Sequence, residues 1–451
     1  MFCENRSVSV ERALLVRGGT VVPMTQPRLF FTGDVLVEGN RIAAVAPSIP
    51  CPPGVQTIDA SGMLVLPGFV QTHVHLVQTL ARYRAEGLTL LDWLARRIWP
   101  YEAALSFEEV TAAASLGIAE LLAGGTTAAL DMGTVHHHQA VFQAAAAFGI
   151  RLVSGKCHMD QGENVPKALL EDTEASLAAA EALKARWHGA CGGRLRYAVA
   201  PRFVLSCSKE LLLGCVTLAR AHELLLHTHA SENREETALV RSLTGQGNVA
   251  FLAELGLGGR DTVLAHCVHL DEDEYTLLAR QGTGVAHCPG ANLKLASGVA
   301  DLPRLLAHGV RVGLGADGPP CNNRLSIFHE MALAGTLHNL RHGPGAVDPW
   351  TVLELATWRG AEVLGYAGEL GKLAPGFLAD LVVLAPSWSW EPWSDPASMV
   401  VFGGGVENVR HVVVDGNPVV VDGQLQTANP EELRREARLA TAALEKRLGL
   451  A

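Results

Sequence analysis

The sequence predicts an α/β fold, a (β/α)8 TIM barrel with a small β-sandwich formed by both chain ends. Three observations support this prediction. Eight short apolar runs in the middle of the chain alternate with longer runs of helical period. Several of these apolar runs end in residues that can bind a metal, and both chain ends show the alternating pattern and turn dipeptides of antiparallel strands.

Length and composition limit the classes of protein to which the chain can belong. Of its 451 residues, 48% are hydrophobic and 18% are charged, and the net charge is −10. This composition is globular, and no concentrated basic segment favours a nucleic-acid or membrane partner. The start, MFCENRSVSVERALLV, lacks a signal-peptide pattern, and no apolar stretch reaches the roughly 18 residues of a membrane span. Nine scattered cysteines without a C-x-x-C pair favour reduced thiols, so we predict a cytoplasmic protein.

The eight apolar runs are predicted to be the barrel strands, because each is short and the segment after it has helical period. In chain order they are 63–73, 126–132, 150–157, 195–201, 224–229, 262–266, 284–288 and 311–317. A doubly wound open sheet is the alternative fold. That fold would need a Gly-rich phosphate loop after the first strand, and the sequence after His75 has none.

The segments between the strands carry helix start and stop signals. Ser106 and Glu109 have the spacing of a capping box, and the helix they begin is predicted to end at Gly124 and Gly125. Two further amphipathic helices are predicted at 176–189 and 208–223.

Both ends of the chain are β-rich. Residues 13–46 contain predicted turns at Gly18-Gly19 and Gly39-Asn40, and residues 378–424 contain Asp-Gly and Gly-Asn turn dipeptides. Neither end is obviously long enough to stand alone, so we expect them to pair. The predicted organisation is a first sandwich part at 1–62, the barrel at 63–370, a second sandwich part at 371–427 and a C-terminal helix at 428–451.

Metal-capable side chains end four of the predicted strands. They are His73 and His75 on the first strand, His227 and His229 on the fifth, His266 on the sixth and Asp317 on the eighth. In a barrel of parallel strands these ends meet at one mouth. Because catalytic zinc favours histidine nitrogen with an occasional carboxylate, the sequence predicts a metal site there.

The HTH stretch on the fifth strand raises the question of which histidine binds the metal. Residues i and i+2 of a strand face the same way but lie roughly 6.5–7 Å apart, so one of them lies deeper. His229 is nearer the mouth and precedes Glu232 by three residues. We therefore assign His229 to the metal and His227 to the layer beneath, as a hydrogen-bonded core histidine.

Six stretches resemble the amidohydrolase superfamily, in the branch that deaminates adenosine-like nucleosides, guanine and triazines. They are PGFVQTHVH (67–75), LHTHASENREE (226–236), AHCVHL (265–270), HCPGANLKLASG (287–298), GLGADG (313–318) and GELGKLAPGFLADLVVL (368–384). The resemblance implies one Zn2+ per chain, with Fe2+ as the alternative, held by His73, His75, His229 and Asp317. It also implies a homodimer or homotetramer, because relatives commonly form these.

The resemblance further implies that Glu232, His266 and Asp317 are catalytic, and their chemistry suits hydrolytic deamination. A metal lowers the pKa of a bound water towards about 7. Asp317 can hold this water and take its proton, while Glu232 can protonate a ring nitrogen. His266 can hydrogen-bond the attacking oxygen, and ammonia then leaves. The P-C-x-x-C motif of the smaller zinc deaminases is absent.

The substrate class follows from a narrower resemblance, to bacterial deaminases of 5′-deoxyadenosine, methylthioadenosine and S-adenosylhomocysteine. The matching stretches are LTLLDWLARRIWPYEA (88–103), MGTVHH (132–137), APRFVLSCS (200–208) and ADGPPCNN (316–323). They imply an adenine nucleoside as substrate, bound in part by Trp99 and Glu102, with Glu102 on the ribose hydroxyls. The alternative for Glu102 is a solvated helix acid.

Other residues keep alternative substrates open. Gln78 and Arg202 occur in guanine deaminases, where they bind the base, so guanine, another oxopurine or a pterin is the main alternative. Triazine-type hydrolysis is a further one, and a non-catalytic scaffold is disfavoured because every expected ligand is present. Lys156 is also expected to contact the substrate.

Several residues have no assigned role. Tyr83, Arg84 and Arg324 depart from the family pattern, and the two arginines either suit an anionic substituent or are surface charge. Of the three histidines at 136–138, we expect at most one side chain to point inward.

Overall fold

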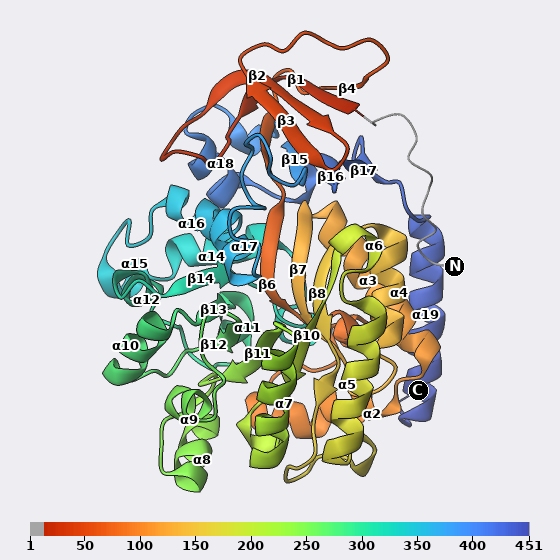
Figure 1. The fold of residues 1–451 in the computed structure, drawn as a ribbon, viewed down its shortest axis with the longest axis vertical. Coiled ribbons are helices and arrows are strands. Elements are labelled where there is room, and N and C mark those ends of the chain that lie inside the picture. Colours follow the sequence, from red (N-terminus) through yellow and green to blue (C-terminus); the bar gives the residue numbers. More distant parts are fainter. Residues whose placement is uncertain (1–12, 451) are drawn as a thin grey trace.

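Eight parallel strands form a barrel in the computed structural model, which describes residues 13–450 (Figure 1). The strands are β6 (Phe69–Val74), β7 (Thr126–Met132), β8 (Arg151–Gly155), β10 (Leu195–Pro201), β11 (Leu225–Ala230), β12 (Thr262–His266), β13 (Gly284–His287) and β14 (Arg311–Leu314). Neighbours pair in chain order, and the short β9 (Cys157–His158) pairs with β10. A parallel bridge between Val74 and Asp317 brings the last strand back to the first. The predicted barrel is therefore confirmed.

The first predicted strand, 63–73, is in fact two strands that belong to different sheets. β5 (Leu64–Pro67) pairs with strands of both chain ends, whereas β6 begins the barrel. Gly68 separates them, and a Cβ at this position would lie 2.2 Å from Thr127 Oγ1. Both halves are buried on both faces, so they share one continuous apolar pattern that hides the break.

Strands from both ends of the chain form one nine-stranded sheet. Besides β5 it contains β1 (Ala13–Val21), β2 (Phe31–Glu38), β3 (Arg41–Ala46), β4 (Gln56–Asp59), β15 (Leu381–Leu384), β16 (Val409–Val414), β17 (Asn417–Val421) and β18 (Gln424–Leu425). The antiparallel pair of β5 and β15 joins the two ends, and Figure 1 shows them together beyond one end of the barrel. The expectation that both ends combine is confirmed. The exact domain ranges stay predictions, and residues 1–12 of the first range, with the start that lacks a signal pattern, lie outside the described residues.

One of the two turns predicted near the N-terminus is wrong. Gly18 and Gly19 lie inside β1, where the pairing with β2 shifts register between Val16 and Gly19 as a β-bulge. The carboxylate of Asp34 on β2 accepts the Gly18 N–H at 2.8 Å, which satisfies a donor that the bulge removes from the ladder. The other predicted turn, Gly39-Asn40, joins β2 to β3 as expected.

Helices cover the outside of the barrel. The longer ones are α3 (Phe107–Ala123), α4 (Gln139–Phe148), α5 (Thr173–Trp187), α7 (Lys209–Ala221), α8 (Arg234–Thr244), α9 (Asn248–Glu254), α10 (Glu272–Gln281), α14 (Ile327–Thr336), α16 (Pro349–Leu355) and α18 (Pro396–Gly403). The predicted capping box is present: the Ser106 hydroxyl accepts the Glu109 N–H at 3.3 Å, and the Glu109 carboxylate accepts the Ser106 N–H at 2.8 Å. The helices expected at 176–189 and 208–223 are α5 and α7.

The C-terminal helix α19 (Pro430–Arg447) runs along the side of the barrel against α3 (Figure 1). The Arg447 guanidinium pairs with Glu109 Oε2 at 2.7 Å, and Arg84 donates to Glu445 Oε1 at 2.5 Å. These contacts hold the segment between β6 and α3, which supplies one wall of the pocket described below. Arg84 is thus engaged with the C-terminal helix, and Tyr83 beside it is exposed.

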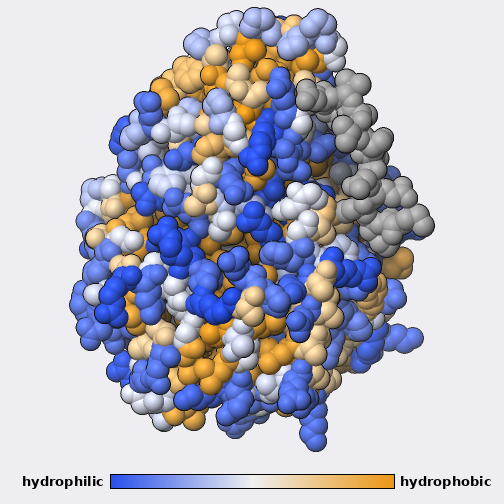
Figure 2. Space-filling model, in the orientation of Figure 1, coloured by the Kyte–Doolittle hydropathy of each residue, from blue (hydrophilic) through white to orange (hydrophobic). Residues whose placement is uncertain are grey.

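The helices, the surface and the cysteines add three findings. No helix in residues 13–450 is long and apolar enough to cross a membrane. In Figure 2, hydrophilic side chains cover most of the middle of the face shown, and hydrophobic ones lie mainly near the terminal sheet and the opposite edge. Among residues 13–450, seven cysteines are free, whereas Cys191 is disulfide-bonded, so the expectation of reduced thiols is wrong at this position.

Candidate active site

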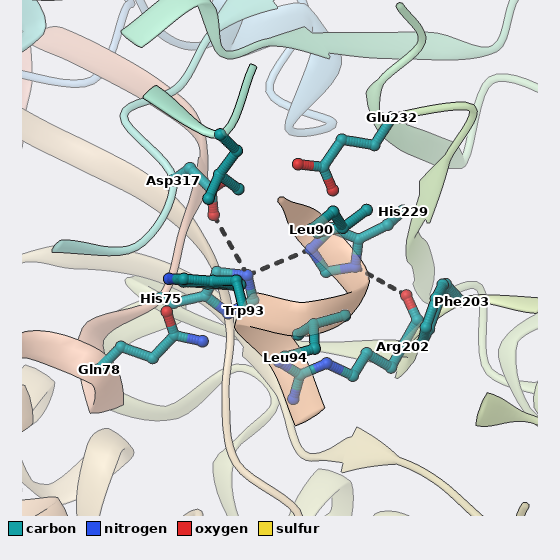
Figure 3. Close-up of a pocket in the computed structure, with 11 residues that line it drawn as sticks. His75, Gln78, Leu90, Trp93, Leu94, Arg202, Phe203, His229, Glu232 and Asp317 are labelled. Carbon is teal, nitrogen blue, oxygen red and sulfur yellow. Dashed lines mark hydrogen bonds and ion pairs between the residues drawn. The ribbon is translucent and has the colours of Figure 1, made fainter. Parts of the chain in front are cut away.

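Four side chains from three strand ends converge at the barrel mouth. They are His73 and His75 of β6, His229 of β11 and Asp317 after β14, and their ligand atoms all lie within 4.8 Å of one another. Asp317 Oδ1 is 3.3 Å from His73 Nε2 and 3.4 Å from His75 Nε2, and His75 Nε2 is 3.2 Å from His229 Nε2. Figure 3 shows three of the four side chains pointing toward one another. The structure therefore brings together the ligand set expected from the sequence.

The second nitrogen of each of these histidines has its own partner. His75 Nδ1 lies 2.8 Å from Met132 O, His229 Nδ1 lies 2.7 Å from Arg202 O, and His73 Nδ1 lies 2.9 Å from His227 Nε2. A partner on Nδ1 fixes the ring and leaves Nε2 directed at the centre of the cluster, as in metal sites generally. His227 is fully buried and supports His73 from below, where the sequence reasoning placed it.

The cluster fits a divalent metal in charge and in unmet bonding. Burial lowers the pKa of His75 to about 3 and holds that of His229 well below its usual range, so both rings are neutral and can coordinate. His73 Nε2 is buried without a hydrogen-bond partner. Burial acts to raise the pKa of Asp317, but the hydrogen bond and charge of His73 together with the charges of His266 and His75 outweigh burial and keep that pKa well below its usual range. Three imidazoles and a carboxylate make a site for a divalent metal.

Two proton-handling groups face this cluster from one side. His266 Nε2 is 3.5 Å from Glu232 Oε2 and 3.8 Å from Asp317 Oδ2. Burial, reinforced by the charge of Asp317, raises the pKa of Glu232 well above its usual range, which favours the protonated form of this acid. Burial lowers the pKa of His266 to about 4, and its ring is neutral. Asn292 Nδ2 donates to His266 Nδ1 at 2.9 Å, which leaves Nε2–H as a donor toward the cluster.

The backbone at these strand ends is strained. His266 has a φ of 75°, Asp317 a φ of 62° and Ser231, next to Glu232, a φ of 52°. Left-handed backbone is unfavourable for residues other than glycine, and it persists at functional sites where the surroundings enforce it. These three residues flank or belong to the cluster, so the strain coincides with the candidate chemistry.

A pocket opens onto the cluster. Besides His75, His229, Glu232 and Asp317, it is lined by Gln78, Leu90, Trp93, Leu94, Arg202, Phe203 and Leu295 (Figure 3). Much of the apolar wall comes from α1 (Leu90–Trp93) and the π-helical η2 (Leu94–Ile98). Sequence reasoning missed the apolar lining residues, because aliphatic and aromatic side chains in an apolar run carry no sign of which face meets a ligand.

Trp99 was expected in the pocket, but Trp93 lines it instead. Trp99 is buried in the core and is absent from the pocket lining. The π-helical stretch between the two tryptophans holds an extra residue per turn relative to an α-helix. Trp99 begins the following helix, α2 (Trp99–Ala104).

Gln78 and Arg202 line the pocket, whereas Glu102 lies behind them. Glu102 accepts a hydrogen bond from Gln78 Nε2 at 2.8 Å and pairs with Arg202 Nη1 at 2.5 Å. It is only 3% exposed, so the alternative of a solvated helix acid is wrong. The other end of the same amide, Gln78 Oε1, is buried without a hydrogen-bond partner. An acceptor and a cation are thus held at the pocket floor.

Lys156 was expected to contact the substrate, but the structure does not place it among the lining residues. Its ammonium pairs with Glu171 and donates to Ser176 Oγ at 2.9 Å. Ser176 belongs to α5, so Lys156 ties the end of the third barrel strand to that helix.

The remaining unassigned residues lie outside the pocket. His136 and His137 are exposed, while His138 is buried and contacts Ser154 Oγ at 3.1 Å, in agreement with at most one inward side chain. Arg324 is exposed.

Comparison with known proteins gives consistent matches. A profile described as the amidohydrolase family matches residues 64–419. A 5-methylthioadenosine/S-adenosylhomocysteine deaminase of Desulforudis audaxviator is 36% identical over 94% of this chain and 97% of its own length. A 5′-deoxyadenosine deaminase of Methanothermobacter thermautotrophicus is 37% identical over 91% of this chain and 95% of its own. A solved structure of an adenosine deaminase from Xanthomonas campestris with bound zinc has a TM-score of 0.90 and 29% identity, and the match covers 96% of this chain and 98% of that one.

Proposed function

Because the chain belongs to the amidohydrolase family, we propose that it is a metal-dependent hydrolytic deaminase of an adenine nucleoside. The substrate would be 5′-deoxyadenosine, methylthioadenosine, S-adenosylhomocysteine or adenosine, and the products would be the inosine analogue and ammonia. One observation carries the proposal: the side chains of Glu232, His266 and Asp317 lie together beside the candidate metal ligands, where an apolar pocket opens onto the cluster. The names of the deaminases matched above support the nucleoside class.

One zinc ion per chain is the proposed cofactor, with iron as the alternative. His73, His75, His229 and Asp317 would hold it. When bound, the metal would lower the pKa of a coordinated water towards about 7 and so make it a nucleophile at neutral pH. The zinc in the solved adenosine deaminase structure supports this choice of metal.

The protein's own groups would move the protons of the reaction. Asp317, ionised, takes a proton from the attacking water, and its Oδ2 lies on the side of His266. Glu232, protonated, gives its proton to the ring nitrogen beside the amino-bearing carbon, which makes that carbon electrophilic. His266 Nε2–H donates a hydrogen bond to the oxygen that adds to the carbon. The C–O bond forms and the C–N bond breaks, and the amino group leaves as ammonia after it receives the proton that Asp317 took from water. The added hydroxyl becomes the ring carbonyl as its own proton returns to Glu232.

The rest of the pocket would orient the purine and exclude water. Leu90, Trp93, Phe203 and their neighbours supply apolar surface for the faces of the base. Gln78 Oε1 offers an unmet acceptor, and Arg202, fixed by Glu102, offers donors. These two polar groups would set the orientation of the base relative to Glu232.

A second candidate is deamination of guanine or another oxopurine. The observation that favours it is that Gln78 and Arg202 face the pocket while Glu102, expected on a ribose, does not line it. A free base would meet both side chains without needing a partner for a diol.

The deciding experiment measures ammonia release by the zinc-loaded protein from equal concentrations of 5′-deoxyadenosine, methylthioadenosine, S-adenosylhomocysteine, adenosine, guanine and 8-oxoguanine. We expect the highest kcat/KM for one of the four adenine nucleosides. A higher kcat/KM for guanine or 8-oxoguanine would transfer the proposal to the second candidate. Ammonia release from none of the six by a chain with one bound metal would reject both. A homodimer or homotetramer and a cytoplasmic location stay predictions from the sequence.

A further inference from the structure

A buried carboxylate on the outer layer of the barrel lies within reach of two loops of the site. Glu330 belongs to α14, which packs against β14 and against the short helix α11 (Pro289–Lys294) (Figure 1). Its side chain is completely buried. Glu330 Oε2 accepts the backbone N–H of Gly290 at 2.9 Å, and Oε1 accepts from Asn322 Nδ2 at 2.7 Å. Burying a carboxylate is costly, so these bonds indicate a role that an apolar residue could not fill.

The first of these bonds leads to His266. Gly290 is two residues before Asn292 on the single turn and a half of α11, and Asn292 Nδ2 donates to His266 Nδ1 at 2.9 Å. The approach between the two elements is close: a Cβ at Gly290 would lie 2.6 Å from Glu330 Oε1 and 2.7 Å from Asn322 Nδ2. The carboxylate therefore fixes the position of α11 relative to α14, and with it the contact that orients the imidazole of His266.

The second bond leads to Asp317. Asn322 ends α13 (Pro319–Asn322), and its Nδ2 also donates to the carbonyl oxygen of Ala316 at 2.8 Å. Ala316 directly precedes Asp317, whose backbone is held at a φ of 62° and donates its N–H to His73 O at 3.0 Å. Both hydrogens of the Asn322 amide are used, one on Glu330 and one on the backbone next to the metal ligand.

From this arrangement we propose that Glu330 is a positioning residue: it fixes the loops after β13 and β14 together, so that Asn292 stays on His266 and Asp317 stays in the metal cluster. The proposal rests on the proposed function only for its effect on rate. Two donors point at the two oxygens of Glu330, and a carboxylate is the side chain that accepts both. Glutamine, of nearly the same shape, has one acceptor and would place an N–H against one of the two donors.

The test compares Glu330→Gln with the unchanged zinc-loaded protein. Loss of a residue that orients a reacting group from behind typically costs about 10–100-fold in activity. We expect kcat for the best substrate to fall by that factor, KM to change by less than about threefold, and one metal per chain to remain. A kcat within twofold of the unchanged protein would overturn the proposal.

A matched control separates positioning from a general loss of stability. Glu274 on α10 is also a buried glutamate that accepts two backbone N–H groups, from Val249 at 3.0 Å and from Asp271 at 3.2 Å, and it touches none of the catalytic groups. Glu274→Gln should lower the melting temperature and leave kcat unchanged. If Glu274→Gln lowers kcat as much as Glu330→Gln does, the effect is general and the proposal fails.

Two measurements test the route through Asn292. In a double-mutant cycle, Glu330→Gln and Asn292→Ala should together lower kcat at least about fivefold less than the product of their single effects, because they remove the same contact. Full multiplication of the two effects would contradict the route. In the zinc-loaded protein labelled with ¹⁵N-histidine, His266 should show a single tautomer with Nδ1 unprotonated, and Glu330→Gln should shift it toward a mixture.

The ¹⁵N measurement needs no substrate, so it decides the proposal even if the protein releases no ammonia from any nucleoside and the proposed function fails. Unchanged His266 resonances in Glu330→Gln would reject the positioning role. If Glu330→Gln does not fold, Glu330→Asp keeps both acceptors on a side chain one methylene shorter. It should show the same tautomer shift to a smaller degree, and no shift would again reject the proposal.

Discussion

The two ends of the barrel hold buried polar clusters of opposite character. At the mouth, His73 Nε2, His266 Nε2 and Glu232 Oε1 are buried without hydrogen-bond partners. At the other end, Arg151 at the start of β8 donates to Asp380 at 2.9 and 3.1 Å and to Asp415 at 2.9 Å.

Asp380 directly precedes β15 and Asp415 directly follows β16 of the terminal sheet, so the Arg151–Asp380–Asp415 cluster joins the barrel to that sheet. Asp380 Oδ1 also accepts the Asp415 N–H at 2.8 Å, and no buried side-chain atom of these three residues lacks a partner. The comparison teaches that a satisfied buried network holds parts of the fold in place, whereas unmet groups that point at one centre mark where another atom is to be bound.

The sharpest test of the cluster at the barrel mouth removes one metal ligand. His229→Ala takes away an imidazole of the four-residue set, so we expect metal content to fall from one to near zero per chain and deamination to be lost. His227→Ala is the matched control on the same strand. It removes only the support of His73 Nδ1, and should weaken metal binding about 10–100-fold without abolishing it. Metal content by elemental analysis after a chelator titration reports both, and equal loss in the two variants would remove the distinction between ligand and support.

Replacement of Glu232 tests whether the groups at the mouth that lack hydrogen-bond partners fall into two kinds, metal ligands and residues that take part in the reaction. Glu232→Gln keeps the shape but carries no transferable proton. We expect kcat to fall about 10²–10⁴-fold, the usual contribution of a positioned acid–base group, while one metal per chain is retained. Loss of the metal would show that Glu232 is a ligand, and a near-normal kcat would show that it is neither.

Disruption of the Arg151–Asp380–Asp415 cluster should lower the stability of the fold and leave the reaction rate unchanged. Asp380→Asn leaves the buried Arg151 guanidinium without its main counter-charge, which typically costs about 3–5 kcal/mol of unfolding free energy. We expect urea denaturation to show this loss, while kcat per metal-loaded folded chain stays unchanged. Arg28→Gln, which breaks the exposed pair with Asp348, is the control and should cost at most about 1 kcal/mol. A drop in kcat for Asp380→Asn would mean that the two ends are coupled.

The strands and the metal ligands could be predicted from the sequence, whereas the residues that support them could not. The strands at 126–132, 195–201 and 262–266 were predicted with the bounds that the structure has, because fully buried parallel strands give short apolar runs. The metal cluster followed from H-x-H and single polar residues at strand ends, which is a local signal once the barrel is assumed. Asn292 and Glu330 carry no such signal, since their partners come from segments far away in the chain.

Small departures from regular geometry account for most of the remaining differences. Gly68 divides one apolar run between two sheets, and the bulge at Gly18-Gly19 keeps a strand going where glycines predict a turn. In each case one residue alters the direction of the next, and a periodic pattern does not record that change.

Between the two extremes lies the cluster of Gln78, Glu102 and Arg202 at the pocket floor. Glu102 and Arg202 form a buried ion pair, like Arg151 and Asp380. Gln78 Oε1 is buried without a hydrogen-bond partner, like the atoms at the barrel mouth. If Glu102 also reaches a bound ribose, as the resemblance to nucleoside deaminases implies, its removal should affect the diol specifically. The comparison of adenosine with 2′,3′-dideoxyadenosine isolates this contribution, because the two nucleosides share the base and differ only at the two hydroxyls.

We expect Glu102→Ala to reduce the ratio of kcat/KM for adenosine to that for 2′,3′-dideoxyadenosine by about 10–100-fold, since each lost charge-assisted hydrogen bond costs about 1.5–3 kcal/mol. The ratio cancels whatever Glu102 contributes through Gln78 and Arg202, because those side chains meet the same base in both substrates. Gln78→Ala is the control and should lower both values of kcat/KM without changing their ratio. A ratio that is the same in Glu102→Ala as in the unchanged protein would show that Glu102 serves only to hold its two neighbours. Glu102 would then have a structural role like that of the Arg151–Asp380–Asp415 cluster. Recognition of a free base by Gln78 and Arg202 would become the better account of the pocket.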